Sequence, residues 1–209
     1  MTEQPQKPSG VDSEIKERWI AMQEELKDQV ILHDTEEWGQ DLRQLKFVAG
    51  MDISYPEEAI GKSEAVACLV IVSYPDLATV YQATENICLT EPYIPGFLAF
   101  RESGPLLNLL EDLLQKRPDL KPDVILIDGN GILHPRRYGC ACHIGLKSGI
   151  PTIGVAKNIY KMDCIEYNKQ ANDLANVGDN ILLNDGELTL GMALKTAKNA
   201  KNPVTNSFC

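Results

Sequence analysis

The chain has 209 residues, of which 44% are hydrophobic and 24% charged, a composition typical of one globular domain with a continuous core. No apolar run approaches the ~20 residues of a membrane-spanning helix, and the first residues do not resemble a signal peptide. We therefore expect a reducing compartment in which the six cysteines are thiols. Cys140 and Cys142 form only a C-x-C pair, so we interpret them as small helix residues and not as zinc ligands.

The formal net charge of -10 argues weakly against a partner as acidic as nucleic acid, because phosphate binding usually requires a basic patch. The acidic excess is unevenly placed. Residues 1–40 contain ten acids and four bases, which accounts for -6 and leaves -4 for the other 169 residues. The overall charge therefore does not exclude a nucleic-acid partner.

The N-terminal residues divide into a tail and a helix. Residues 1–10 are polar and include two prolines and a glycine, which predicts a flexible tail, whereas residues 11–209 are expected to form a single domain. From residue 12 to about residue 38 apolar side chains recur every three or four positions, which is typical of an amphipathic helix packed on the body. These side chains are Val11, Ile15, Trp19, Met22, Leu26 and Val30.

Three strands are expected next. Residues 46–54, 65–73 and 78–89 are apolar or alternating runs with short connections, and the second connection contains the turn signal Tyr74-Pro75-Asp76. Such a succession predicts an antiparallel meander.

Helices alternate with strands in the middle of the chain. Residues 97–115 and 138–148 predict helices, and residues 124–127 and 152–156 predict fully buried strands. We therefore expect an α/β fold with a mixed sheet, in which parallel strands follow the meander and helices flank the sheet. Residues 179–183 and 187–194 flank Asn184-Asp185-Gly186, which predicts a hairpin.

Three acids occupy positions that suit a metal site. Asp52 ends the first strand, Glu102 lies in the first turns of a helix, and Asp128 ends the first parallel strand, while Lys157 ends its neighbour. Because the carboxyl ends of parallel strands gather ligands, these groups could meet at one edge, where Mg²⁺ or Mn²⁺ would relieve the repulsion between carboxylates. The alternative is that each acid only improves solubility or complements a helix dipole.

Four segments resemble the main motifs of the endonuclease V family. They are FVAGMDIS at 47–54, PYIPGFLAFRE at 92–102, DGNGILHPRRYG at 128–139 and PTIGVAK at 151–157. They occur in the family's order, and the resemblance covers about residues 10–200. The DGNG and ACH segments are more similar to the animal branch than to the bacterial one.

The resemblance implies a ribonuclease H-like fold and a Mg²⁺-dependent endonuclease, with Mn²⁺ as a substitute. Such an enzyme hydrolyses the second phosphodiester bond 3′ to inosine in single-stranded RNA or deaminated DNA, leaving 5′-phosphate and 3′-hydroxyl ends. Asp52, Glu102 and Asp128 match the family's metal-binding acids, and Lys157 matches its catalytic lysine. We expect a monomer located in the cytoplasm, with the nucleus and nucleolus as further locations.

Tyr93 in PYIP matches the family's wedge, which fills the gap left when the target base is taken out of the stack. An aromatic ring between prolines is held rigidly and can stack where a base was. Without the motif, the preferred interpretation of Tyr93 would be a turn aromatic packed on the core.

Several residues match the family's substrate pocket. Gly129 and Gly139 match positions that line a hypoxanthine pocket, where glycine lets the backbone approach a flat base. Leu98 resembles the apolar wall, and Gly96 belongs to the same substrate-binding set. His134 could contact the substrate phosphate or make a core hydrogen bond, and the adjacent arginines could bind phosphate or form a solvated face.

The chain departs from the family's pattern at residues 202–209, NPVTNSFC. The family continues here into a Gly-His-basic segment, whose histidine contributes to the active site, and then a helix. None of His33, His134 and His143 takes that position, so we expect a domain shortened at its C-terminus, with apolar surface exposed. Two functions therefore stay open: an active nuclease, and an inosine-binding protein that cuts weakly or not at all.

Overall fold

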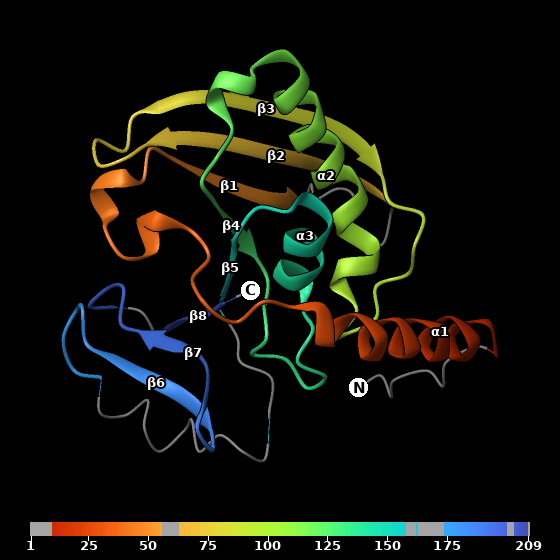
Figure 1. Cartoon of the computed structure of the whole chain (residues 1–209). Coiled ribbons are helices and arrows are strands. Elements are labelled where there is room, and N and C mark those ends of the chain that lie inside the picture. Colours follow the sequence, from red (N-terminus) through yellow and green to blue (C-terminus); the bar gives the residue numbers. More distant parts are fainter. Residues whose placement is uncertain (1–9, 56–62, 158–161, 163–173, 200–202, 209) are drawn as a thin grey trace.

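The computed structural model describes residues 10–55, 63–157, 162, 174–199 and 203–208, so most of the proposed N-terminal tail lies outside the described residues. Within these ranges eight strands form one mixed sheet in the order β3-β2-β1-β4-β5-β8-β7-β6 (Figure 1). The strands are β1 (Phe47–Ser54), β2 (Glu64–Ser73), β3 (Thr79–Cys88), β4 (Val124–Asp128), β5 (Thr152–Ala156), β6 (Asn180–Asp185), β7 (Leu188–Leu194) and β8 (Val204–Phe208). The α-helices are α1 (Gly10–Leu26), α2 (Leu98–Lys116) and α3 (Cys140–Ser148), and short 3-10 turns are η1 (Lys27–Gln29), η2 (Glu37–Gly39), η3 (Leu42–Gln44) and η5 (Pro118–Leu120).

The antiparallel meander is confirmed. β1 pairs antiparallel with β2, and β2 pairs antiparallel with β3. In β2 the residues Ala65, Ala67, Leu69 and Ile71 are buried and alternate with half-buried ones, which is the period-2 pattern of a strand with one face on the core. Helix α2 packs over this face.

The parallel part of the sheet is also confirmed. β1 pairs parallel with β4, and β4 pairs parallel with β5. Helices α2 and α3 lie together against one face of these strands (Figure 1). The apolar side of α2, which includes Leu106, Leu110 and Leu113, is almost fully buried and forms the main core with β1, β2 and β4. The fold is therefore the α/β, ribonuclease H-like arrangement that the sequence predicts.

The opposite face of these strands is less covered. Val48 and Val70 are half-buried there, and Leu126 is 36% exposed. Alternate residues of a strand share a face, so Asp52 lies on the same side of β1 as Val48, and Asp128 on the same side of β4 as Leu126. The two aspartates thus end apolar rows that point away from α2 and α3.

The N-terminal helix differs from the prediction. α1 ends at Leu26 instead of near residue 38, and one 3-10 turn and an irregular segment follow. Trp19 is buried and stacks on Phe100, with ring centroids 5.2 Å apart. Met22, assigned to the apolar face, is 36% exposed, whereas the polar Gln23 is only 1% exposed. The buried face of α1 is therefore rotated from Met22 toward Gln23. The amide of Gln23 can be buried because it donates hydrogen bonds to backbone carbonyls, as described below.

The hairpin is confirmed, with β6 and β7 joined by a turn in which Gly186 has a φ of +59°. A further strand, β8, was not predicted; it pairs antiparallel with both β5 and β7 and so joins the hairpin to the sheet. Leu183, Leu190 and Ala193 of the hairpin pack against the loop before α3 in a second apolar cluster. None of the helices in the described ranges is long and apolar enough to span a membrane, and the four cysteines described are free thiols.

Candidate active site

Strand register brings three of the predicted site residues to one edge of the sheet. Met51 of β1 pairs with Ile127 of β4, and Asp52 and Asp128 are the next residues on these parallel strands. β5 reaches the same edge, because Asp128 pairs with Val155, and Lys157 follows two residues later. Burial, and then the charge of Asp128 within hydrogen-bonding reach, raise the pKa of Asp52, while the Lys157 ammonium opposes the rise.

Glu102 approaches this pair from the first turns of α2 and is only 7% exposed. Burial raises the pKa of its carboxyl to about 7, and the charges of Asp52 and Asp128 act in the same direction. Tyr55 Oη donates a hydrogen bond of 2.7 Å to Glu102 Oε1, and the Arg101 guanidinium lies 5.8 Å from the centre of the Tyr55 ring. Tyr55 was missed in the sequence analysis, although it directly follows the strand that bears Asp52.

Asp52, Glu102 and Asp128 suit a hard cation, although their side chains are not arranged around one point. Within the described residues no group of three or more His, Cys, Asp or Glu side chains is assembled in a metal-binding arrangement. Carboxylate repulsion is nevertheless present, because neighbouring carboxylate charge adds to burial in raising the pKa values of Asp52 and Glu102. Carboxylate oxygens under mutual repulsion are the donors that Mg²⁺ prefers, so these residues fit the predicted ion.

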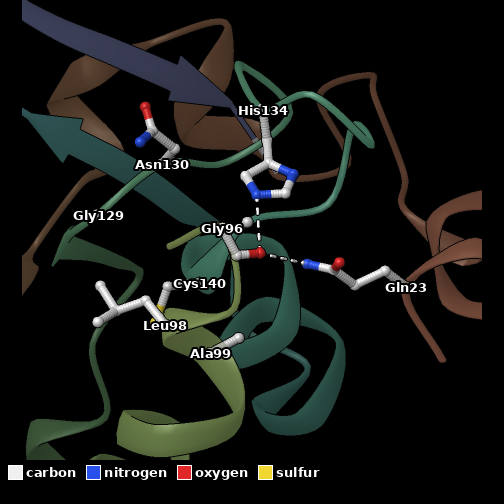
Figure 2. A pocket seen from close by; sticks show the side chains of 9 residues that line it. Gln23, Gly96, Leu98, Ala99, Gly129, Asn130, His134 and Cys140 are labelled. Carbon is white, nitrogen blue, oxygen red and sulfur yellow. Dashed lines mark hydrogen bonds between the residues drawn. The ribbon is translucent and has the colours of Figure 1, made fainter. Parts of the chain in front are cut away.

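A cavity lies beside the acids, and five of the six predicted substrate-binding residues line it (Figure 2). It holds about 300 Å³ of empty space, part of it open to solvent. The predicted residues in its lining are Gly96, Leu98, Gly129, His134 and Gly139, and they are joined by Gln23, Ala99, Asn130 and Cys140.

Two glycines of the lining are required by the backbone. A Cβ atom at Gly139 would lie 2.0 Å from the carbonyl oxygen of Asn130, a distance that no side chain tolerates. Gly129 has a φ of +146°, and a Cβ there would meet the Cβ of Cys140 at 3.2 Å. The loop that follows β4 can therefore fold tightly against the start of α3.

Of the two roles left open for His134, the structure shows the core hydrogen bond. The ring is 2% exposed, its Nε2 lies 3.0 Å from the Gly96 carbonyl oxygen, and its Nδ1 accepts from the Arg136 N–H. These bonds indicate that Nε2 bears the proton. Burial, and then the Arg136 charge, lower the pKa of His134 to about 4, so the ring is neutral.

The two arginines are also engaged within the protein. Arg136 lies 4.2 Å from the centre of the Phe97 ring and donates to the carbonyl oxygen of Gly96. Arg137 is paired with Asp185 of β6. Arg136 therefore contacts a residue that lines the cavity, Gly96. The pattern HPRR alone does not predict this contact.

Tyr93, the remaining predicted substrate residue, is 66% exposed. It lies three residues before Gly96, whose backbone turns at a φ of +83° toward α2. An aromatic ring packed on the core would be buried, so its exposure argues against the purely structural alternative. Its role as a wedge stays a prediction.

The acidic edge and the adjoining cavity can be compared with known proteins. The family model described as endonuclease V matches residues 24–208. The chain belongs to the endonuclease V family. Members of this family are nucleases, and human endonuclease V is 40% identical over 203 residues, which cover 93% of this chain and 71% of the human protein.

Solved structures agree with this assignment. The catalytic domain of human endonuclease V superimposes with a TM-score of 0.86 at 36% identity, covering 96% of this chain and 82% of that domain. Endonuclease V (D234N) of Ciona intestinalis, in complex with a 23mer DNA containing an inosine followed by a ribo-adenosine, superimposes with a TM-score of 0.79 at 34% identity. That alignment covers 93% of this chain and 82% of the Ciona chain.

Proposed function

We propose that this protein is a Mg²⁺-dependent endonuclease that binds inosine in a nucleic acid strand and hydrolyses the second phosphodiester bond on its 3′ side. The products have 5′-phosphate and 3′-hydroxyl ends. The substrate is single-stranded RNA, or DNA in which adenine has been deaminated. The inosine-containing ligand of the Ciona relative supports the choice of base.

The observation that supports this function best is the continuity between the cavity and the acids. Asp128 belongs to the acidic edge, and the next residue, Gly129, lines the cavity. Leu98 lines the cavity as well, and Glu102 follows it one helical turn later on α2. A base held in the cavity would therefore keep its own strand within reach of the carboxylates.

Each group of predicted site residues has its own role in this reaction. Asp52, Glu102 and Asp128 would hold Mg²⁺, which supplies a Lewis acid for the phosphate oxygens when bound. The Lys157 ammonium, at the same edge, orients the scissile phosphate or the attacking water through its positive charge. The exposed ring of Tyr93 stacks in the gap that the extracted base leaves.

A second candidate is an inosine-binding protein with weak or no cleavage. The specific observation in its favour is that Glu102 is hydrogen-bonded to Tyr55 and that the described residues form no assembled metal cluster. In that case the cavity would still bind the base, but the acids would rarely join around an ion.

One experiment separates these candidates. The protein is incubated with end-labelled strands of identical sequence that contain inosine or adenosine at one position, as RNA and as DNA, with Mg²⁺. Cutting only of the inosine strand, at the second bond 3′ to the base and with a 5′-phosphate that ligase accepts, is the expected result. Retardation of the inosine strand without cutting would favour the binding protein. Equal treatment of inosine and adenosine strands would contradict both.

A further inference from the structure

Gln23 of α1 lies outside the acidic edge, yet its side chain reaches into the wall of the cavity (Figure 2). Its Nε2 donates to the carbonyl oxygen of Gly96 at 3.1 Å and to that of Tyr138 at 2.8 Å. Its Oε1 accepts from Nε of Arg136. Gln23 is only 1% exposed, on a helix whose described residues are otherwise largely exposed. Both protons of its amide nitrogen and its amide oxygen take part in hydrogen bonds.

The two carbonyls belong to two separate segments at the wall of the cavity. Gly96 lines it from the turn before α2, and Tyr138 directly precedes Gly139, which lines it from the loop before α3. These segments are far apart in the sequence, and the amide of Gln23 connects them. Because both bonds leave the same nitrogen atom, they fix how far apart the two carbonyl oxygens lie.

The carbonyl of Gly96 is held unusually firmly. It receives Nε2 of Gln23 at 3.1 Å, Nε2 of His134 at 3.0 Å and Nη2 of Arg136 at 2.8 Å. An oxygen with two lone pairs that meets three donors is fixed in direction, and the peptide to which it belongs is fixed with it. The positive φ of Gly96, +83°, would otherwise make this peptide one of the easier ones to reorient.

The position of α1 makes this bridge stable. Trp19, one turn before Gln23 on the same face, stacks on Phe100 with an interplanar angle of 9° and lies 5.8 Å from the Phe97 ring. The aromatic contacts join α1 to the start of α2, and they hold Gln23 over the cavity. Burial of an amide is costly unless its hydrogen bonds are made, so its placement here needs the three bonds described.

We propose that Gln23 is a positioning residue that sets the geometry of the base cavity and thereby its preference for hypoxanthine over adenine. This inference rests on the proposed function, because it takes the cavity as the base site. Adenine presents an amino donor where hypoxanthine presents an oxo acceptor, and its N1 accepts where that of hypoxanthine donates. Walls built from backbone groups distinguish the two patterns only while their peptides keep one orientation.

The test compares two variants with one control. Gln23→Met keeps the length and removes every hydrogen bond, and Gln23→Asn keeps the amide but is one methylene too short to reach both carbonyls. Gln29→Met makes the same change at an exposed glutamine of the adjoining turn. Dissociation constants are measured for strands with inosine and with adenosine in Ca²⁺, and the thermal unfolding of each protein is recorded alongside.

The preference, taken as the ratio of the two dissociation constants, should fall by about tenfold in Gln23→Met, the scale of one net hydrogen bond. Gln23→Asn should lie between this variant and the parent, and Gln29→Met should match the parent. A purely structural role would lower the melting temperatures and leave the ratio unchanged in the folded variants, which would overturn the inference. A parent protein without preference would overturn the proposed function itself, and this inference with it.

Discussion

The buried Glu102 should make the metal-free protein less stable as the pH rises. Its pKa in the folded protein is about 7, compared with an ordinary value of 4.5. The folded state therefore holds this proton more tightly than the unfolded chain, and stability decreases as the pH rises from about 4.5 to about 7. At ~1.4 kcal/mol per pH unit, the whole interval corresponds to about 3 kcal/mol.

Glu102→Gln removes this titration while keeping the size of the side chain and an acceptor for Tyr55 Oη. In EDTA the variant should therefore gain stability relative to the parent between pH 5 and pH 8.5, by up to about 3 kcal/mol. Urea unfolding at both pH values measures this gain. Mg²⁺ at pH 8.5 should stabilise the parent more than the variant, because the ion needs the charged carboxylate.

Glu111→Gln provides the matched control, since Glu111 lies on the same helix but is exposed. Its unfolding free energy should follow that of the parent at both pH values. If the unfolding free energies of Glu102→Gln and the parent changed in parallel from pH 5 to pH 8.5, Glu102 would not have a raised pKa in the folded protein, and this reasoning would be refuted.

Three further outcomes are expected. Asp52→Ala or Asp128→Ala should abolish cleavage and leave the melting temperature in EDTA unchanged or higher, because the substitution relieves carboxylate repulsion; near-parental rates in Mg²⁺ would contradict the site. Tyr93→Ala should weaken binding of inosine strands by roughly 1–3 kcal/mol, the scale of one base–aromatic stack, and equal affinities would return the residue to a structural role. Gly139→Ala should lower both stability and inosine binding, because its Cβ would overlap the carbonyl of Asn130, and unchanged melting would show that the loop has another conformation.

The sheet could be predicted because its strands obey a simple pattern. Short apolar runs such as β4 and β5, with a helix between them, favour parallel strands. Parallel strands have their final residues at the same edge of the sheet. Asp52 and Asp128 were expected to meet if their strands were neighbours, and the parallel pairing of β1 with β4 fulfils that condition. Asp128 and Gly129 are consecutive, so the neighbourhood of cavity and acids was also implicit in the sequence.

The parts that were missed depend on contacts between distant residues. A glutamine on a helix has no periodic signal, and only the carbonyls of Gly96 and Tyr138 explain why Gln23 is buried and Met22 is not. The choice between the two roles of His134 could not be made from the sequence for the same reason, because its hydrogen-bond partner, Gly96, lies in another loop. β8 was not predicted because five residues, three of them with polar side chains, are too few to show the alternation of a strand.

The position of β8 in the sheet has a consequence for the order in which the protein folds. β6 and β7 precede β8 in the chain, yet they reach the central strands only through it. During synthesis the five strands from β3 to β5 can pair as soon as β5 leaves the ribosome, whereas the β6–β7 hairpin must wait for a strand made later. Until then the edge of β5 that later pairs with β8 has unpaired backbone groups. That edge ends beside Lys157. A nascent chain stalled before β8 would therefore present an open strand edge next to the acidic edge of the sheet, where a second chain could pair in the place of its own β8.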